Sequence, residues 1–492
     1  MKTSILEYIN DSNVSILDKI KRLKTGRKRP LPNIEKYRSQ WDVSKHRTMT
    51  DLGYLPYRWV SEPTGRKDAK GKEIMRSRYI DVNRLAFPFQ KKIVKSKISF
   101  ALGNPIKLLC ETDDANELKV LNALKRIDHD CKLKSFRRKQ LRECSRSTEV
   151  AEIWYTKPYD KSNTGTKHST YGFDTTLKVK VTDLSPWEGN VLYPYFDETN
   201  DMVVFSREFQ LQNDIEQSDQ YFELYTDEKH IIWMLEYGTA SWIVYKEEEN
   251  KLKKIPANYM PQEAVEWGDI QWAIERLELL LSKHAEKNDY HASPKVFVEG
   301  KIESFVQKGD AGGIIQGASG SKAYYLSWDH ATESVKLEIE TLLRFIYGFT
   351  QTPDISFDSV KGLQAVSGVA LELLFMDAHL KVQELREMLD DYLQRQINIQ
   401  KAFIAFMAPD LKKATENIRV EPEVTPYMVN DKGELIKQLS EAVAAGIKSK
   451  RQAIKELGDV DDIDAEMEQI EKEESSKTNI FQPKADLVSG DN

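Results

Sequence analysis

The chain has 492 residues, 40% of them hydrophobic and 30% charged, which is typical of a folded protein with several cores and excludes a fully disordered or fibrous one. Its net charge of −6 argues against tight binding to DNA phosphates, because that mode of binding requires clustered excess Lys and Arg. No apolar run approaches the roughly 20 residues that span a bilayer, and the N-terminus lacks a signal peptide, so we expect the protein to stay in the cytoplasm where it is made.

Residues 1–145 have mainly helical patterns, interrupted at residues 65–72 by a stretch rich in Gly and Lys that we expect to be an exposed loop. The most apolar part, residues 82–109, fits an amphipathic helix that ends at the Gly-Asn-Pro turn of residues 103–105. The basic runs at residues 19–29 and 132–139 are typical of solvated faces. Three cysteines without CxxC spacing are expected to be reduced and to serve packing: Cys110, Cys131 and Cys144.

Between residues 149 and 254 the pattern changes to short runs of β-branched and aromatic residues separated by turns, which predicts strands. The clearest runs are at residues 151–156, 177–182, 202–207, 220–225 and 242–246. Since no helical crossover separates them, we expect an antiparallel sheet of consecutive hairpins. A break at Pro256 to Pro261 is expected to end this region.

Two helices then flank a small β-rich insert. Residues 268–289 predict the first helix, and residues 333–347 predict the second, opened by Thr332 and closed by Gly348. Between them, residues 295–299 and 323–327 predict strands on either side of a glycine-rich segment, residues 309–320. A polar loop with a central proline follows at residues 350–362.

Residues 363–407 keep a helical pattern without an internal proline. At ~1.5 Å per residue such a helix would reach roughly 65 Å, which is longer than most globular domains need. A helix of this length indicates a coiled coil, a membrane span or an assembly, and its charged residues exclude the membrane.

The C-terminal part is expected to begin with a strand at residues 417–424 and to continue with two short amphipathic helices. These helices are predicted at residues 434–445 and 449–456, joined at Gly446. Residues 459–474 are strongly acidic, and we expect the chain to be disordered from about residue 475.

No catalytic or cofactor-binding pattern emerges from the residues. The glycine-rich segment lacks the GxxxxGK[ST] order that cradles phosphates, and Lys322 does not stand where that motif needs a lysine. The eight histidines have no metal-binding spacing, and no GxSxG nucleophile turn is present. We therefore predict a structural protein without enzymatic activity, metal or cofactor.

The order of these elements resembles the portal proteins of tailed bacteriophages, particularly those of long non-contractile-tailed phages of Bacillus. Three segments carry the resemblance: residues 83–108 (NRLAFPFQKKIVKSKISFALGNPIKL), 367–371 (SGVAL) and 445–474 (AGIKSKRQAIKELGDVDDIDAEMEQIEKEE). The last is similar to the family's Gly-Ile-Ile-Ser-x-x-Thr segment with its following Val-Asp-Asp and Glu-rich repeats, although Lys448 and Arg451 depart from that pattern. The resemblance covers roughly residues 80–475.

The resemblance implies an α+β, mainly helical subunit that assembles as a ring. Its parts would be an N-terminal wing at 1–265 (helical 1–145, sheet 149–254), a stem helix at 266–290, a clip at 291–329, a second stem helix at 330–348, a tunnel loop at 349–361, a long wing helix at 362–408, a crown at 409–474 and a disordered tail at 475–492.

It also implies three sets of functional residues. The tunnel loop would face DNA through Thr350, Gln351, Asp354, Ser356, Asp358 and Lys361. The clip would contact the packaging terminase and the adaptor through Lys295, Phe297, Glu299, Lys308 and Tyr324. Neighbouring subunits would bury the apolar stripe of the long helix at Leu371, Leu374, Val382, Leu385 and Leu389.

The partners implied are further copies of the chain in a dodecamer, the terminase large subunit, the head–tail adaptor, capsid and scaffolding proteins, and double-stranded DNA passing without sequence specificity through a ring at the portal vertex of the virion. Modest acidity agrees with this, because a basic channel would trap phosphates. Two alternatives remain. Another ring-forming head–tail connector or adaptor would lack this order of elements, and a nucleic-acid-processing enzyme would need metal-binding carboxylates or a nucleotide site.

Overall fold

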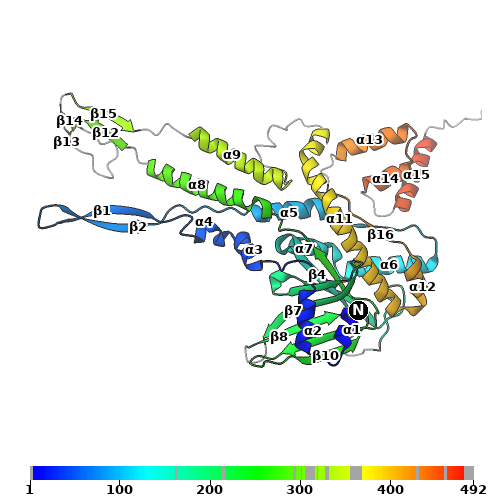
Figure 1. Ribbon diagram of the computed structural model, residues 1–492. Helices are drawn as coiled ribbons and strands as arrows, with labels where there is room; N and C mark the ends of the chain where they lie inside the picture. Colours follow the sequence, from blue (N-terminus) through cyan, green and yellow to red (C-terminus); the bar gives the residue numbers. More distant parts are fainter. Residues whose placement is uncertain are drawn as a thin grey trace, which may run out of the picture. The chain divides into compact units, whose positions relative to one another are not determined.

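The computed structural model describes residues 4–160, 165–212, 217–291, 295–300, 302–304, 316–318, 320–326, 332–354, 368–427, 432–458 and 463–480. Its contacts divide the chain into a first unit, residues 1–354 with 377–427, and a second unit, residues 355–376 with 428–492. Helices and strands are mixed in the larger unit, which confirms the α+β fold class (Figure 1). Among the described helices, none combines the length and apolar character that crossing a bilayer requires.

The N-terminal segment is partly helical and partly a hairpin. Its helices are α1 (Ile5–Asn10), α2 (Ile16–Thr25), α3 (Ile34–Trp41) and α4 (Arg47–Thr50). Strands β1 (Arg58–Lys67) and β2 (Glu73–Ile80) then pair antiparallel, so the prediction of helix over this stretch was wrong. The predicted loop includes the hairpin's turn, where Gly71 (φ 79°) supplies a positive φ angle that other residues avoid. Gly65 (φ 71°) supplies another within β1, where the register with β2 is irregular.

Three helices form the next core. They are α5 (Phe89–Leu102), α8 (Gln271–His291) and α9 (Thr332–Phe349), and they share buried side chains such as Ile93, Ile274 and Ile346. The two predicted flanking helices are therefore confirmed. The helix expected over residues 82–109 is shorter, because the chain turns after α5 and enters β3 (Lys107–Leu109), which pairs with β16 (Glu421–Glu423).

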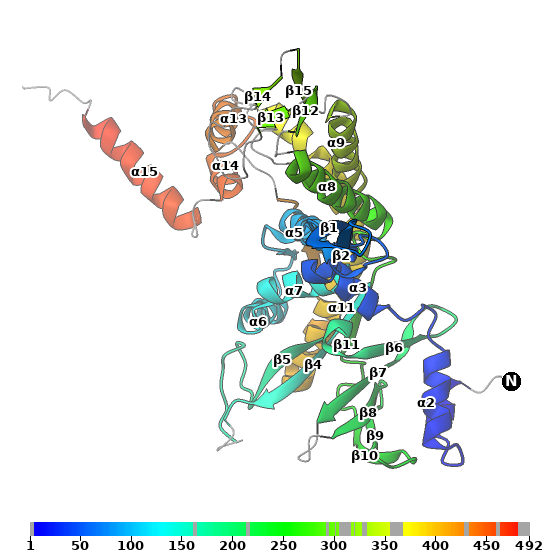
Figure 2. The same cartoon turned by 90° about the vertical axis from the view of Figure 1, so that its left-hand side faces the viewer.

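The β-rich region contains two sheets, not one. The five-stranded sheet has the order β10-β9-β8-β7-β6 and is antiparallel throughout, as the turns predict, whereas the smaller sheet has the order β11-β4-β5. Helices α1 and α2 bury Ile9, Ile20 and Leu23 against the larger sheet (Figure 2). The strands are β4 (Glu149–Pro158), β5 (Leu177–Leu184), β6 (Val191–Phe196), β7 (Met202–Gln212), β8 (Ser218–Tyr225), β9 (Lys229–Leu235), β10 (Ile243–Glu249) and β11 (Ala257–Pro261).

All five predicted runs lie in strands, but β6, β9 and β11 were missed. Strand β11 occupies the segment expected to be a break. It pairs with β4 from Ala257↔Ile153 to Pro261↔Glu149, and its residues alternate too little in polarity to predict a strand, because Ala257, Asn258 and Met260 are all buried.

The long helix α11 (Gly368–Met407, 40 residues) is confirmed, and its C-terminal part packs with α6 (Ala115–Asp130), α7 (Leu133–Ser147), η4 (Pro409–Leu411) and α12 (Lys412–Asn417). Ile397 and Ile404 enter the same core as Leu124 and Trp154. The helix lies along its own chain's sheet and helices over this part (Figure 1).

The insert between α8 and α9 contains β12 (Lys295–Glu299) paired with β15 (Lys322–Leu326), as predicted, and the short pair β13 (Ile302–Ser304) and β14 (Gln316–Gly317). In the second unit, α13 (Lys432–Ala444) and α14 (Lys450–Leu457) confirm the two short helices. The acidic run continues as α15 (Ile463–Ile480), so the prediction of disorder from residue 475 was wrong as far as Ile480, and residues 481–492 lie outside the described chain.

Candidate functional site

The start of the predicted tunnel loop folds back on the end of α9. The Thr350 hydroxyl donates to the Ile346 carbonyl (2.6 Å) and lies 3.0 Å from the Thr352 hydroxyl, while the Thr352 N–H donates to the Tyr347 carbonyl (2.9 Å). Both threonines are buried, at 6% and 4% exposure. The Thr350 side chain therefore closes the helix instead of facing DNA, which corrects the prediction for this residue.

The remaining predicted loop residues divide into two groups. Gln351 is half-buried with a φ of +49°, and Asp354 is half-buried at the last described position before the loop continues. Ser356, Asp358 and Lys361 lie outside the described residues. The structure therefore describes the first residues of the loop, up to Asp354, and the contacts that hold them.

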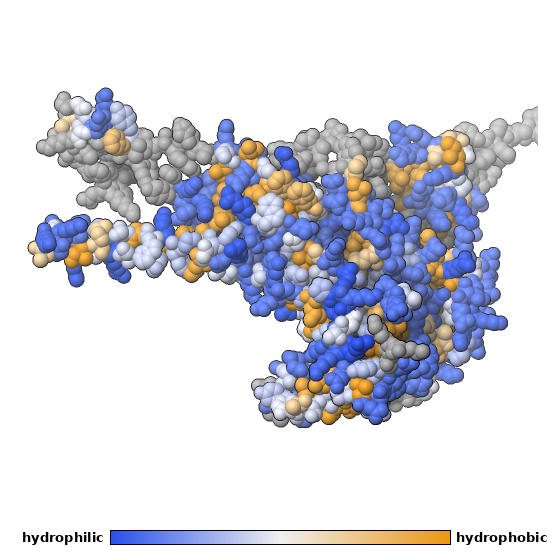
Figure 3. Space-filling view, viewed as in Figure 1, coloured by the Kyte–Doolittle hydropathy of each residue, from blue (hydrophilic) through white to orange (hydrophobic). Residues whose placement is uncertain are grey.

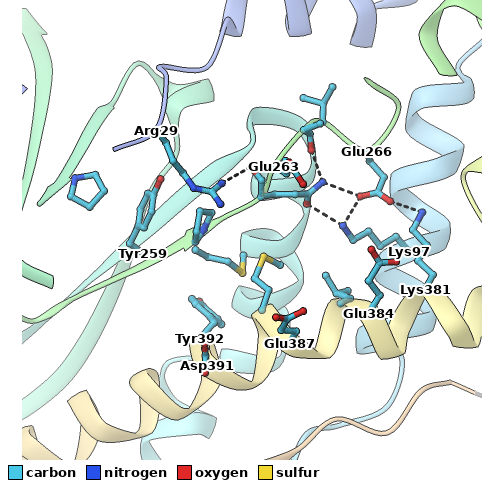
Figure 4. A pocket seen from close by; sticks show the side chains of 18 of the residues that line it. Arg29, Lys97, Tyr259, Glu263, Glu266, Lys381, Glu384, Glu387, Asp391 and Tyr392 are labelled. Carbon is cyan, nitrogen blue, oxygen red and sulfur yellow. Dashed lines mark hydrogen bonds and ion pairs between the residues drawn. The ribbon is translucent and has the colours of Figure 1, made fainter. Parts of the chain in front are cut away.

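Lys381 of α11 holds this starting point. Its ammonium group donates to the Thr350 carbonyl (2.6 Å) and pairs with Glu266. Lys97 of α5 pairs with the other oxygen of the same carboxylate, and Figure 4 shows both lysines pointing at Glu266. We call Lys97, Glu266 and Lys381 the Glu266 cluster. It joins α5, the segment after β11, and α11 to the end of α9.

The protonation of the Glu266 cluster follows from burial and from charge. Burial alone would raise the pKa of Glu266, but the ammonium groups of Lys97 and Lys381 outweigh it and lower that pKa to about 2. Burial lowers the pKa of Lys381, although Glu266 opposes the shift. The carboxylate is therefore ionised at neutral pH and supplies the negative charge that the two buried lysines need.

A cavity of about 1210 Å³ opens beside the cluster. Acidic side chains of α11 line one part of it (Glu384, Glu387 and Asp391), and the basic segment before α3 lines another (Arg27, Lys28 and Arg29) (Figure 4). Within the described residues no group of three or more His, Cys, Asp or Glu side chains is placed to hold a metal ion. The cavity walls thus mix charges of both signs.

Glu152 fixes the middle of α11 to the smaller sheet. The carboxylate is fully buried and accepts from the Trp154 indole (2.8 Å), the Gln396 amide (3.1 Å), the Asn258 amide (3.3 Å) and the Tyr392 hydroxyl. Burial raises the pKa of Glu152, and these donors oppose the shift. Four donors on one buried carboxyl hold the helix in one register against β4 and β11.

Three of the predicted interface residues are buried inside their own chain. Val382, Leu385 and Leu389 are 1%, 8% and 2% exposed, so their side chains are already covered within the protomer and the interface prediction for them is corrected. The side chains of Leu371 and Leu374 lie outside the described part of the structure. Among the described residues of the same helix, Met376 (48%), Leu380 (53%) and Phe406 (39%) are exposed apolar residues.

The predicted clip residues lie on the β12–β15 pair. Phe297 and Tyr324 are directly opposite each other in the register and are 53% and 48% exposed, and Glu299 is also exposed. Lys295 belongs to β12, although its side chain is not described, and Lys308 lies outside the described residues. The structure therefore brings Phe297 and Tyr324 together as an exposed aromatic pair.

The Glu266 cluster was missed from the sequence. A signal was present, because Lys381 falls between Ala378, Val382 and Leu385 on the face of α11 that is buried. A lysine on such a face needs a partner, but the partner lies 115 residues away and cannot be identified from spacing.

The model of the family described as "Phage portal protein, SPP1 Gp6-like" matches residues 21–479. Among solved structures, a chain of the neck of an empty GTA particle computed with C6 symmetry aligns with a TM-score of 0.41 and 10% identity, covering 90% of this chain and 99% of that one. A chain of the neck of a native GTA particle computed with C12 symmetry aligns with a TM-score of 0.38 and 11% identity, covering 76% and 90%. No curated protein matches the chain in sequence.

Proposed function

Because the chain belongs to the SPP1 Gp6-like family of phage portal proteins, we propose that copies of it form a dodecameric ring at one capsid vertex, through which double-stranded DNA is packaged and later ejected. The observation that carries the proposal is the family match, which extends over nearly the entire chain. The subunit would be made and assembled in the host cytoplasm and would belong to a long non-contractile-tailed phage of Bacillus.

In this proposal the segment after Thr350 lines the channel. Its start is held by Lys381 and by the closing hydrogen bonds of α9, while α8 and α9 form the stem. A polar loop projecting from a rigid base suits a constriction that touches passing DNA without gripping it, and Asp354 and Asp358 would repel phosphates while Lys361 contacts them transiently.

The tunnel role is tested by deleting residues 354–358 in a virion, with a control in which Gly and Ser of equal number replace them. We expect rings to assemble normally and DNA packaging or retention to fall in the deletion, because the deletion leaves the helices and strands of the subunit in place. Wild-type packaging and retention would contradict the tunnel assignment, and failure to form rings would make the loop an interface element instead.

The exposed pair Phe297 and Tyr324 would contact the terminase large subunit during packaging and the head–tail adaptor afterwards. Aromatic side chains contribute much of the binding energy at interfaces. We expect the double substitution Phe297→Ser with Tyr324→Ser to leave the ring intact and to weaken terminase and adaptor binding by at least about tenfold, since truncating one such residue commonly costs more than about 1 kcal/mol. Unchanged binding of both partners would remove these residues from the clip contact.

A further inference from the structure

The β1–β2 hairpin has two chemically different faces. Directly paired residues of an antiparallel ribbon lie on the same face, and the pairs Trp59↔Tyr79, Ser61↔Ser77 and Pro63↔Met75 alternate with the pairs Val60↔Arg78 and Glu62↔Arg76. The first set contains no charged residue, and we call it the neutral face. The second set carries the charges, including the Arg78–Glu62 ion pair at 2.8 Å.

The neutral face is uncovered in the protomer. Trp59 is 60% exposed, Tyr79 61% and Met75 52%, and every residue of the two strands except Val60 and Ile80 is exposed. The rings of Trp59 and Tyr79 lie with their centroids 3.8 Å apart, which forms a continuous aromatic surface. A two-stranded ribbon is marginally stable alone in water, so an apolar face of this kind indicates a surface that becomes covered.

The base of the hairpin is fixed to the stem. Arg58 pairs with Glu286 of α8 (3.1 Å), and the same carboxylate accepts from the backbone N–H of Asn83 (3.1 Å). Arg84 donates to the carbonyls of Thr48 (2.8 Å) and Leu55 (2.9 Å). The ribbon therefore leaves the body beside the C-terminal end of α8 and continues past that end (Figure 1).

The stem helices carry a second uncovered aromatic surface. Trp272 of α8 is 55% exposed and Phe349 at the end of α9 is 70% exposed. Phe345 lies between them, with centroids 6.4 Å from Trp272 and 5.4 Å from Phe349. Hydrophobic side chains are visible both on the hairpin and over α8 and α9 in Figure 3. One chain thus exposes two unlike aromatic surfaces.

Charge distinguishes the two surfaces. The hairpin, residues 58–80, has seven basic and three acidic residues, a net charge of +4, whereas α8 and α9 together have five basic and seven acidic residues, a net charge of −2. Opposite net charges favour contact between the hairpin of one copy and the stem of another over contact between two hairpins. A head-to-tail ring requires two such different, complementary surfaces on each subunit.

We propose that the neutral face of the β1–β2 hairpin packs against the Trp272–Phe345–Phe349 surface of the next copy in the ring. The inference rests on the proposed ring. The hairpin is then an arm between subunits. The subunit interface lies on the hairpin and on α8 and α9, and not on the buried stripe of α11.

The energetic test compares three double substitutions in the full-length chain. They are Trp59→Ser with Tyr79→Ser on the neutral face, Trp272→Ser with Phe349→Ser on the stem, and, as a control of equal exposure, Tyr237→Ser with Tyr245→Ser at the end of the larger sheet, both 59% exposed in the native chain. We expect each of the first two to raise the protein concentration for half-assembly at least tenfold, and the control to change it less than twofold. Combining the first two should cost no more than either alone, because both remove one contact.

A second measurement identifies what covers the arm. A benzophenone attached to Met75→Cys, in a chain with Cys110→Ser and Cys131→Ser, is photoactivated in rings mixed from isotopically light and heavy copies. Cross-links to α8 or α9 peptides of the other isotope are the expected result. Cross-links within one copy, or to other segments, would overturn the inference.

Failure of the proposed function and failure of the proposed arm would give different results. If the wild-type chain forms no ring, the proposed function fails and the arm fails with it. If the wild-type chain forms rings and the neutral-face variant assembles at the same concentration, the proposed function stands and the arm is wrong, which leaves a capsid or scaffolding protein as the partner of that surface.

Discussion

The long helix α11 and the β1–β2 hairpin both carry an apolar surface, but the chain uses them in opposite ways. In α11, Val382 and Leu389 are almost fully buried by the same chain, and Lys381 on the same side is paired with Glu266. In the hairpin, Trp59 and Tyr79 are more than half exposed. An apolar stripe therefore indicates that a surface is buried, but it does not identify the chain that covers the surface.

The difference separates protomer stability from assembly. Substitutions in the buried part of α11 should lower the free energy of unfolding of each subunit, because they remove contacts inside it. Substitutions on the neutral face should leave that free energy unchanged and should weaken association instead.

The largest effect is expected at the Glu266 cluster. Glu266→Ala leaves two buried lysines without a counter-charge, and breaking a buried ion pair from one side costs about 3 to 5 kcal/mol. Denaturant unfolding of the monomer, at a concentration below assembly, would measure this loss. Glu384→Ala, which removes an exposed carboxylate of α11, is the matched control, and equal effects of the two would contradict the structural role of the cluster.

Leu389→Ala should destabilise the protomer by about 3 kcal/mol, because truncating a buried leucine loses its transfer free energy and leaves a cavity. Leu389 is 2% exposed, whereas Leu380 on the same helix is 53% exposed. Leu380→Ala should therefore change the free energy of unfolding by less than about 0.5 kcal/mol. If Leu389→Ala changed the free energy of unfolding only slightly but weakened assembly strongly, the apolar stripe of α11 would belong to the subunit interface after all.

Lowering the pH should reduce the stability that the Glu266 cluster gives to the protomer, and it should not act through the hairpin. The pKa of Glu266 is held at about 2, below its ordinary value of 4.5, so its contribution is complete above about pH 4.5 and is lost as the pH falls toward 2. A difference of this size corresponds to about 3 kcal/mol at most. Unfolding measured between pH 6 and pH 3 should show a smaller loss in Glu266→Gln than in the wild type, and equal slopes would contradict the shift.

The smallest effect on the protomer is expected for Trp59→Ser with Tyr79→Ser. Because both side chains are largely in solvent, the free energy of unfolding of the monomer should change by less than about 0.5 kcal/mol per substitution. Calorimetry at a concentration below assembly measures this quantity. A loss comparable with that of Leu389→Ala would show that the neutral face supports its own chain.

Periodicity was sufficient to predict α8, α9, α11, α13, α14 and the most apolar strands, because each has a local pattern of apolar residues. The hairpin was missed because its neutral face is built from Trp, Tyr, Ser, Pro and Met in an otherwise charged segment, which lacks the β-branched run typical of strands. Strand β11 was missed because pairing with β4, more than 100 residues earlier in the chain, defines it more than its composition does.

The sequence predicted where the candidate site lies along the chain, but it did not predict the contacts of the residues there. The order of the elements places a loop after α9, and Phe297 and Tyr324 lie on paired strands as expected. The burial of Thr350 was not predictable, because its hydroxyl turns back to the Ile346 carbonyl and its own carbonyl accepts from a lysine 31 residues later. Glu152 was likewise hidden, since its four donors come from three separate segments.

The proposed function and the proposed arm both require that the chain assembles into a ring. Mass photometry of the purified full-length chain over a range of concentrations, with imaging of the same sample down its symmetry axis, measures the number of copies and the presence of a central opening. The proposed function predicts closed rings with an open centre. A well-folded chain that remains monomeric at every concentration would contradict it.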